Sequence, residues 1–206
     1  MPHPIRLYRS PLSGHAHRVE LMLSLLGVPC ERIDVDLRAG AHRQPEFLAR
    51  NAFGQVPVIE DGAVTLADSN AILVYLAGAY DPAGGWLPRE PVAAARVQRW
   101  LSVAAGELAA GPNTARLGML FGRQVDVARA QEVAARLFGL MEAALEAAPF
   151  LAGGAPTIAD VAIYSYTVLA PEGGVSLAPY PAIRAWLARI EALPGFVPMT
   201  RSKEAA

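Results

Sequence analysis

The chain has 206 residues, of which 53% are hydrophobic and 18% charged, and its formal net charge at pH 7 is -1. This apolar content can fill two compact cores, and the charged residues form no basic stripe of the kind that binds nucleic acid. No apolar segment reaches the roughly 20 residues that span a bilayer, and the charged, proline-containing start is unlike a signal peptide, so we expect a cytoplasmic protein.

The first eighty residues alternate strand patterns with helix patterns. Gly27 is a typical helix stop, Asp61-Gly62 is a hairpin turn signal, and Asp68-Ser69 is a helix start. The predicted elements are, in chain order, a strand at 4–8, a helix at 13–26, a strand at 30–35, a short helix at 45–50, a hairpin at 56–60 and 63–66, and a helix at 69–80. The order βαβαββα predicts an α/β domain over residues 1–80.

Cys30 begins the second predicted strand and is the only cysteine of the chain. A single cysteine excludes an internal disulfide, a CxxC redox pair and a cysteine-based zinc site. We read Cys30 as a packing residue. Any thiol chemistry would therefore arrive with a ligand, and we expect no metal.

Residues 81–91 are rich in proline and glycine, which predicts a linker. Everything beyond it, residues 92–206, has helical patterns rich in alanine and leucine. The predicted helices are at 92–121, 126–148, 157–170 and 180–192. Thr157 and Asp160 have the spacing of a capping box, which predicts a structural role for this aspartate. The second domain is therefore expected to be all-α.

Several segments resemble the glutathione S-transferase family. In the first domain they are 7–13 (LYRSPLS) with Arg18-Val19, 51–62 (NAFGQVPVIEDG) and 66–72 (LADSNAI), and in the second they are 156–160 and 180–183. The pattern is similar to bacterial serine-type cytosolic members, of the phi-, delta- or zeta-like kind. The resemblance implies a thioredoxin-like N-terminal domain, an all-helical C-terminal domain and a homodimer. It also implies a detoxification enzyme that conjugates glutathione, its co-substrate, to small apolar electrophiles without a further cofactor.

Within this resemblance, Ser13 is the residue expected to hold the thiolate of glutathione. A hydroxyl at a helix N-terminus can donate a hydrogen bond to sulfur while the helix dipole favours the negative charge. Ser10 and Tyr8 are the alternates. On the residues alone, Ser13 could equally be a helix cap. A serine hydrolase with His17 as base is a further alternative, although no GxSxG motif surrounds Ser13.

The resemblance also implies the residues that bind the tripeptide. Val56 would pair through its main chain with the cysteinyl part, next to a cis peptide bond at Pro57. Asp68 would accept from the γ-glutamyl ammonium, and Ser69 would donate to the γ-glutamyl carboxylate. His42 and Gln55 are expected near the cysteinyl and glycyl ends.

The electrophile pocket is expected from apolar and polar residues of both domains. The candidates are Leu12, His15, Asn113, Arg116, Leu117 and Tyr164. Arg18 also matches a position of the family pattern. An arginine on the first helix more often serves packing or dimer contacts. Other activities of the same fold stay open: a glutathione-dependent isomerase, a dehalogenase, a peroxide or disulfide reductase, or a non-catalytic regulatory protein.

Overall fold

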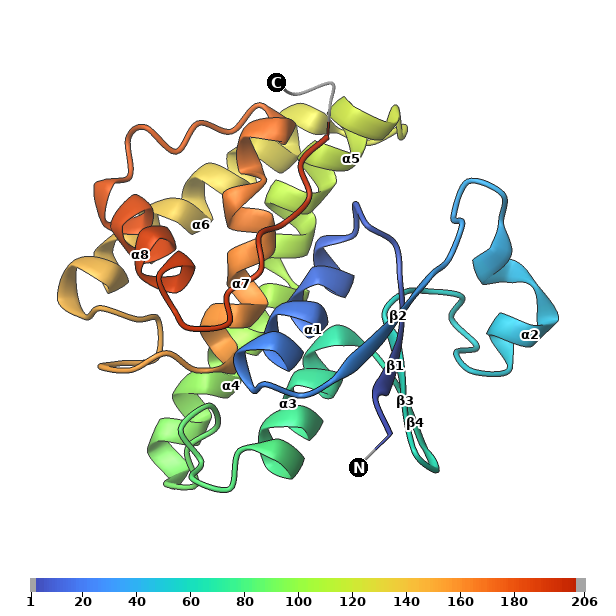
Figure 1. Ribbon diagram of the computed structural model, residues 1–206. Helices are drawn as coiled ribbons and strands as arrows, with labels where there is room; N and C mark the ends of the chain where they lie inside the picture. Colours follow the sequence, from blue (N-terminus) through green and yellow to red (C-terminus); the bar gives the residue numbers. More distant parts are fainter. Residues whose placement is uncertain (1–2, 203–206) are drawn as a thin grey trace. The chain divides into compact units, whose positions relative to one another are not determined.

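The structure is a computed structural model that describes residues 3–202 (Figure 1). The chain forms two compact units. Among the described residues, the first unit contains 3–83 together with Pro194–Thr200, and the second contains Gly84–Leu193 with Arg201 and Ser202. The division after Ala83 falls inside the expected linker, 81–91. The predicted combination of an α/β unit and an all-helical unit is confirmed.

The first unit is a four-stranded sheet with helices, and its strand order is β2-β1-β3-β4. Its elements are β1 (Ile5–Arg9), α1 (Gly14–Leu25), β2 (Cys30–Asp34), the 3-10 turn η1 (Ala41–Arg43), α2 (Pro45–Leu48), β3 (Val58–Asp61), β4 (Val64–Ala67) and α3 (Ser69–Tyr80). Strand β1 is parallel to β2 and antiparallel to β3, which is antiparallel to β4. The predicted order βαβαββα is therefore confirmed.

The strand register brings four loops to one end of this sheet. Tyr8 near the end of β1 pairs with Val58 at the start of β3, and Val58 also pairs with Ala67 at the end of β4. Arg9 pairs with Asp34 at the end of β2. The segments that follow β1, β2 and β4, and the segment that precedes β3, therefore all leave the sheet at the same end.

The two faces of the sheet are covered differently. Helices α1 and α3 lie together on one side, and α2 lies on the other (Figure 1). Because successive strand residues point to opposite faces, Leu7 and Tyr8 enter different cores. Tyr8 belongs to a small cluster with Val35, Phe47 and Val58 on the α2 side. Its ring meets that of Phe47 edge-on, with the centroids 6.4 Å apart.

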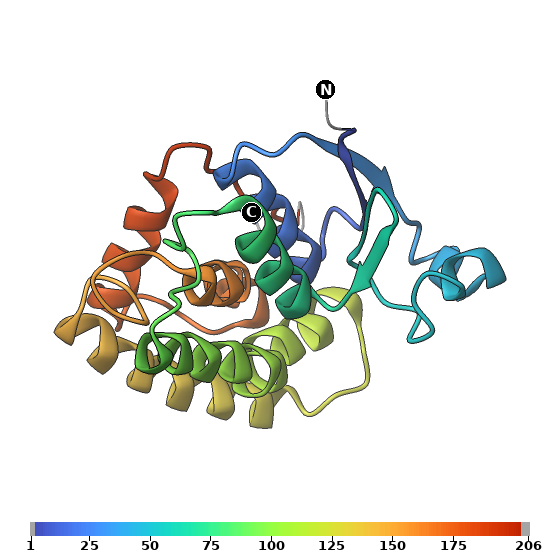
Figure 2. The ribbon, with the colours of Figure 1, turned by 90° about the horizontal axis from the view of Figure 1, so that it is seen from below.

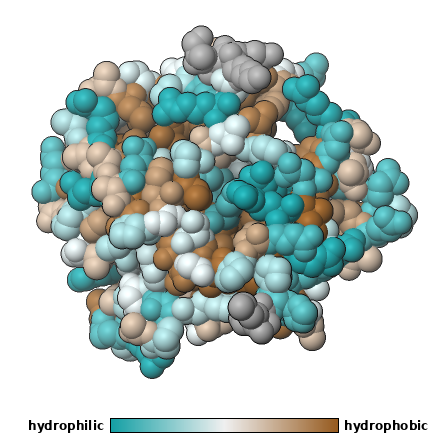
Figure 3. Space-filling model, viewed as in Figure 1, coloured by the Kyte–Doolittle hydropathy of each residue, from teal (hydrophilic) through white to brown (hydrophobic). Residues whose placement is uncertain are grey.

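Strand β2 is a charged edge of the sheet. Its residues Glu31, Arg32 and Asp34 are exposed, and Figure 3 shows hydrophilic residues gathered over this part of the first unit. Charged side chains on an edge strand discourage pairing with another strand.

The second unit is helical. Its elements are α4 (Pro91–Ala105), the π-helical turn η2 (Ala109–Asn113), α5 (Thr114–Phe121), α6 (Val127–Ala147), α7 (Ile158–Val168), the 3-10 turn η3 (Ala170–Gly173) and α8 (Pro181–Glu191). Every residue of α7 is buried, and Figure 2 shows α4, α6 and α8 around it. The predicted capping box of Thr157 and Asp160 is present at its N-terminus.

The single helix predicted over 92–121 is wrong, because α4 ends at Ala105 and α5 starts only at Thr114. Between them lies the π-helical turn, which contains Pro112. A proline inside a helix removes one N–H donor and collides with the preceding turn. After this turn, the side chain of Thr114 donates to the carbonyl of Ala109 at 2.8 Å. The alanine-rich pattern concealed this break.

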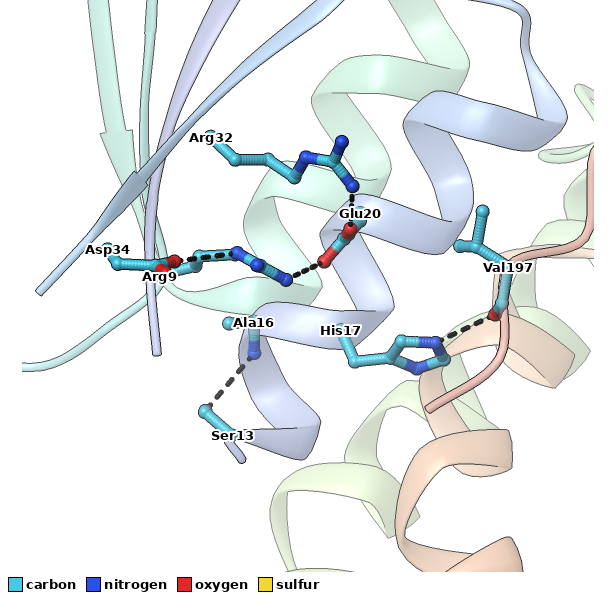
Figure 4. A network of polar contacts seen from close by, with 8 residues as sticks. All are labelled: Arg9, Ser13, Ala16, His17, Glu20, Arg32, Asp34 and Val197. Atoms are coloured by element: carbon cyan, nitrogen blue, oxygen red, sulfur yellow. Dashed lines mark hydrogen bonds and ion pairs between the residues drawn. The ribbon is translucent and has the colours of Figure 1, made fainter. Parts of the chain in front are cut away.

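The segment Pro194–Thr200 belongs to the first unit, although residues 92–206 were expected to form one domain. His17 on α1 donates from Nε2 to the carbonyl of Val197 at 2.9 Å (Figure 4). Gly195 has a φ of 84°, and a Cβ there would lie 2.7 Å from the carbonyl oxygen of Ser24. The close approach to α1 therefore requires glycine.

Candidate functional site

Ser13 stands at the N-terminus of α1, where β1 gives way to the helix. It is the N-cap, and its Oγ accepts from the N–H of Ala16 at 3.2 Å (Figure 4). Because the oxygen accepts this bond, the hydroxyl hydrogen can still be donated to another group. Ser13 is half-buried, and the positive end of the helix dipole favours an anion beside it. The cap interpretation and the thiolate interpretation of Ser13 are compatible.

A charged network fixes α1 against the sheet near Ser13. Glu20 on α1 accepts from Arg9 at 2.6 Å and from Arg32 at 2.9 Å, and Arg9 also contacts Asp34 at 2.9 Å (Figure 4). These ion pairs join α1 to β1 and β2. The start of the helix therefore has a defined position at the end of the sheet.

Tyr8 and Ser10, the alternates, have different environments. The hydroxyl of Tyr8 donates to Glu60 at 3.0 Å, and the guanidinium of Arg50 lies 4.8 Å from the ring centroid. Its hydrogen is therefore already used. The carbonyl of Ser10 accepts from the N–H of Ser13 at 3.0 Å, which shapes the turn before α1. The geometry favours Ser13 over Tyr8 as the donor.

The Val56–Pro57 peptide bond is cis, as the sequence predicted. Within the described part of the chain, the main-chain groups of Val56 form no hydrogen bond. The loop before it is held by buried Asn51, whose side chain donates to the carbonyl of Gln55 at 2.8 Å and accepts from Phe53 at 3.1 Å. Sequence analysis did not identify this role of Asn51. In turns, an asparagine side chain often accepts from the backbone N–H two residues later, as Asn51 does from Phe53.

His42 and Gln55 lie in loops at the same end of the sheet. His42 is in η1, and its Nδ1 is buried with no hydrogen-bond partner among residues 3–202. The side chain of Gln55 is exposed. Gly54 brings the two loops together, since its φ is 59° and a Cβ there would lie 3.0 Å from the carbonyl oxygen of His42.

Asp68 caps α3 in an unusual backbone conformation, with φ 70° and ψ 120°. Its Oδ1 accepts from the N–H groups of Asn70 and Ala71, both at 2.9 Å. The other carboxylate oxygen can therefore accept from a cation. The N–H of Ser69, the first residue of α3, has no acceptor in the described structure. A helix N-terminus with an open N–H favours a carboxylate.

The electrophile-pocket candidates are divided between the units. Leu12 and His15 lie in the first, and Asn113, Arg116, Leu117 and Tyr164 lie in the second. Arg116 is 2% exposed and forms an ion pair with buried Glu172 at 2.5 Å. Tyr164 is buried, and its hydroxyl donates to Glu191 at 2.9 Å. Burial and this hydrogen bond raise the pKa of Tyr164. Both side chains are thus engaged in the core of the second unit.

His17 and Cys30 are not placed for nucleophilic chemistry. Figure 4 shows the His17 ring turned away from Ser13, toward Val197, and burial lowers its pKa. This geometry does not support a Ser13–His17 hydrolase. Burial, with a further contribution from Glu20, raises the pKa of Cys30 to about 11. Its thiol is therefore protonated at neutral pH, which disfavours a reductase based on this cysteine.

Two further observations concern membrane-spanning helices and metal sites within residues 3–202. No helix among them is long and apolar enough to cross a membrane. In the same range, no group of three or more His, Cys, Asp and Glu side chains could hold a metal ion.

Comparison with known proteins gives consistent matches over most of the chain. Residues 3–78 match the family model "Glutathione S-transferase, N-terminal domain", and residues 97–194 match "Glutathione S-transferase, C-terminal domain". The maize protein Glutathione S-transferase 3 is 35% identical over 205 residues, covering 94% of this chain and 91% of its own.

Solved structures agree with the sequence matches. A glutathione S-transferase from Pseudomonas fluorescens is 33% identical with a TM-score of 0.90, and the match covers 97% of this chain and 100% of the other. A glutathione transferase homologue from Drosophila mojavensis, solved with bound glutathione, is 28% identical with a TM-score of 0.84. That match covers 93% of this chain and 89% of the other.

Proposed function

The chain belongs to the glutathione S-transferase family, and on this premise we propose that it conjugates glutathione to small apolar electrophiles at the common end of its four strands. The observation that carries the proposal is the register of Tyr8, Val58 and Ala67. It brings the Ser13 turn, the cis Val56–Pro57 bond and the start of α3 to one end of the sheet.

In this site Ser13 donates a hydrogen bond to the sulfur of glutathione. A free thiol has a pKa of about 8.5, so only a few per cent is ionised at neutral pH. The hydroxyl and the N-terminus of α1 both stabilise the thiolate, which is the nucleophile. Attack forms the carbon–sulfur bond, and the electrophile then loses its leaving group or gains a proton.

The main chain of Val56 binds the cysteinyl part in the manner of an added strand. Asp68 accepts from the γ-glutamyl ammonium through its Oδ2, and Ser69 donates to the adjacent carboxylate. His42 and Gln55 approach the rest of the peptide from the neighbouring loops. Both charges of the γ-glutamyl group are matched at the first turn of α3.

For the electrophile, the proposal retains the half-buried side chains Leu12 of the first unit and Asn113 and Leu117 of the second as candidates. Arg116 and Tyr164 are buried and already bonded within the second unit, so the proposal gives them no direct contact with the electrophile. Glutathione is the co-substrate, and the proposed reaction uses no other cofactor. We place the enzyme in the cytoplasm, where thiols are kept reduced.

Calorimetric titration tests the proposal. Glutathione is expected to bind with a dissociation constant on the order of 1 μM to 1 mM, which is the usual range of KM values. The protein is expected to catalyse conjugation of 1-chloro-2,4-dinitrobenzene. Absence of glutathione binding by the folded protein would rule out the proposed function.

We also propose a homodimer, and Phe53 is the candidate contact. Its side chain is 86% exposed in a loop that Asn51 holds in place, so a large apolar ring is displayed on a fixed support. The wild type is expected to sediment as a dimer, and Phe53→Ser is expected to shift it toward the monomer. Analytical ultracentrifugation measures both masses. A monomeric wild type at every concentration would contradict the dimer, and an unchanged Phe53→Ser dimer would remove Phe53 from the interface.

A further inference from the structure

Arg50 lies where α2 has ended and the loop to the cis Val56–Pro57 bond begins. Its Nε donates to Oε1 of Glu60 on β3 at 2.8 Å, and its Nη1 donates to the carbonyl of Glu46 on α2 at 2.7 Å. The same guanidinium lies over the ring of Tyr8 on β1. One side chain thus joins the end of α2 to two strands of the sheet.

Glu60 is the acceptor at the centre of this contact. Its Oε2 accepts from the Tyr8 hydroxyl at 3.0 Å and from Nη1 of Arg6 at 2.6 Å, while its Oε1 accepts from Arg50. Burial alone would raise the pKa of Glu60, but the hydrogen bonds from these donors and the two guanidinium charges outweigh burial, so this pKa is lowered. An isolated ion pair at a surface contributes little, but this carboxylate is half-buried and shared by three donors.

The bond between Arg50 and Glu60 closes the loop that carries Val56. The loop follows Arg50, which is bound to β3, and it ends at Val58, the first residue of the same strand. Both ends of the 51–57 loop are therefore attached to β3. The main chain of Val56 lies between these two attachments, so its position depends on both of them.

The 51–57 loop also contacts the turn η1. Gly54 approaches this turn so closely that a Cβ on it would lie 3.0 Å from the carbonyl oxygen of His42. The side chain of Asn51 bonds to the N–H of Phe53 and to the carbonyl of Gln55, so the loop is held together internally. A shift at the start of the loop would therefore displace Gln55 and His42 together. The proposed function assigns both residues to the part of glutathione beyond the γ-glutamyl group.

We propose that Arg50, bound to Glu60, is a positioning residue that fixes the 51–57 loop and thereby the preference for a thiol peptide with a glycyl residue after its cysteine. The inference rests on the proposed function, because it takes the glutathione site beside this loop as given. Arg50 acts through the loop and does not touch the thiol. Ser13 lies in a different turn, after β1, so ionisation of the bound thiol should not depend on Arg50.

The test compares glutathione with γ-glutamylcysteine, which has the same thiol and γ-glutamyl group but lacks the glycyl residue. Arg50→Met keeps most of the side-chain length and removes the charge and the donors. It is expected to raise KM for glutathione about tenfold, with kcat within about twofold of the wild type. KM for γ-glutamylcysteine should rise by less than about threefold, because this peptide has no glycyl contacts to lose. The preference for glutathione in kcat/KM therefore falls.

Two further variants show whether the loss is specific to Arg50. Arg189→Met is the matched control, because Arg189 on α8 also donates to a main-chain carbonyl, that of Pro149 at 3.0 Å, and its guanidinium lies 6.0 Å from the ring centroid of Phe150. This variant should leave KM for both thiols unchanged. Arg50→Lys keeps a cation beside Glu60, and its KM for glutathione is expected to stay within about threefold of the wild type.

A double variant measures whether Arg50 acts through Glu60. In a Glu60→Ala background, Arg50→Met is expected to cause less than about a threefold further rise in KM for glutathione, since its partner is already gone. Hydrogen exchange gives a second readout of the loop itself. The N–H groups of Phe53 and Gly54 are bonded within the loop, and they should exchange at least about tenfold faster in Arg50→Met, whereas those of α1 should keep their wild-type rates.

Three results would overturn the inference and leave Arg50 with a role in packing only. The first is an equal rise in KM for both thiols in Arg50→Met. The second is wild-type exchange of Phe53 and Gly54 in this variant. The third is an undiminished effect of Arg50→Met, about tenfold, in the Glu60→Ala background.

Other outcomes separate this inference from the proposed function. If the wild type binds glutathione and Arg50→Met has the wild-type KM, the inference is wrong and the proposed function stands. The same holds if the wild type binds glutathione without preferring it to γ-glutamylcysteine. A wild type that does not bind glutathione would remove both. Should Arg50→Met fail to fold, Glu60→Gln removes the charge of the acceptor and is expected to lower the preference for glutathione; an unchanged preference in Glu60→Gln would contradict the positioning role.

Discussion

Replacing Ser13 by alanine is expected to lower kcat/KM for glutathione conjugation by about 10- to 100-fold, the effect of losing one hydrogen bond to a charged group. The loss should appear mainly in kcat at neutral pH, because a smaller fraction of bound glutathione is ionised. In the proposed site, glutathione is bound by Val56, Asp68 and Ser69, so its dissociation constant should change by less than about threefold. Steady-state kinetics and calorimetry measure these two quantities.

Ser13 also caps α1, so the variant needs a control for the cap. Ser13→Gly is suitable, because glycine at an N-cap costs only a few tenths of a kcal/mol relative to serine, whereas alanine costs about 1 kcal/mol. Both variants should lose activity equally if the hydroxyl is what matters. Ser10→Ala and Tyr8→Phe are expected to retain wild-type kcat. A larger loss in Ser10→Ala than in Ser13→Gly would move the thiolate contact to Ser10.

Asp160→Ala is expected to reduce the free energy of unfolding by about 3 to 5 kcal/mol, because it leaves several buried donors without an acceptor. Asp160 is 1% exposed. Its Oδ1 accepts from the N–H of Leu151 and from Nε1 of Trp186, both at 2.9 Å. Its Oδ2 accepts from the N–H of Thr157 at 2.9 Å and from the Thr157 hydroxyl at 3.1 Å. The carboxylate thus ties the start of α7 to α8 and to the preceding loop.

Asp160→Asn separates the two oxygens of this carboxylate. An asparagine can keep the bonds to Leu151 and Trp186 through Oδ1, but its amide group would face the N–H of Thr157 with another donor. Asp160→Asn is therefore expected to lose roughly half as much free energy of unfolding as Asp160→Ala. Denaturant unfolding followed by circular dichroism gives both values. An asparagine variant as unstable as the alanine variant would show that the Thr157 side of the network dominates. A stable alanine variant would contradict the structural role.

The α/β elements were predictable because their signals are local. Gly27 ends α1, Asp68 caps α3, and the Asp61-Gly62 turn lies in the hairpin, so the strand and helix boundaries fall within a few residues of the prediction. The break between α4 and α5 was not predicted. The many alanine and leucine residues, which have high helix propensity, predicted a continuous helix. Pro112 was the single residue in this stretch that indicated a break.

The candidate site was predictable only as separate segments. Sequence motifs indicate Ser13, Val56-Pro57 and Asp68-Ser69, but the register that gathers them is a long-range property of the sheet. The contact between Arg18 and Ser69 joins residues 51 positions apart. The only local signal for Arg18 was a charged residue close to the apolar positions Val19, Leu21 and Met22 of the same helix. The return of Pro194–Thr200 to the first unit had no local signal.

The acceptor to which each hydroxyl group donates its hydrogen could be identified only from the structure. Tyr8 and Ser13 are both hydroxyl donors near the end of β1, and the sequence favours Ser13 only through its resemblance to the serine-type pattern of the family, including the spacing to Val19. In the structure the Tyr8 hydroxyl donates to Glu60, while Ser13 accepts from Ala16 and keeps its hydrogen available. This difference makes Ser13 the better candidate for the thiolate contact.

The central claim, that Ser13 stabilises the thiolate, is tested most directly by the pKa of enzyme-bound glutathione. Thiolate absorbance in the ultraviolet, followed against pH with saturating glutathione, measures this pKa. In the wild type, the pKa of bound glutathione is expected to be at least about 1 unit below the free-thiol value of about 8.5. In Ser13→Gly, this pKa is expected to rise most of the way back to the free-thiol value. The same lowered pKa in wild type and Ser13→Gly would contradict the claim.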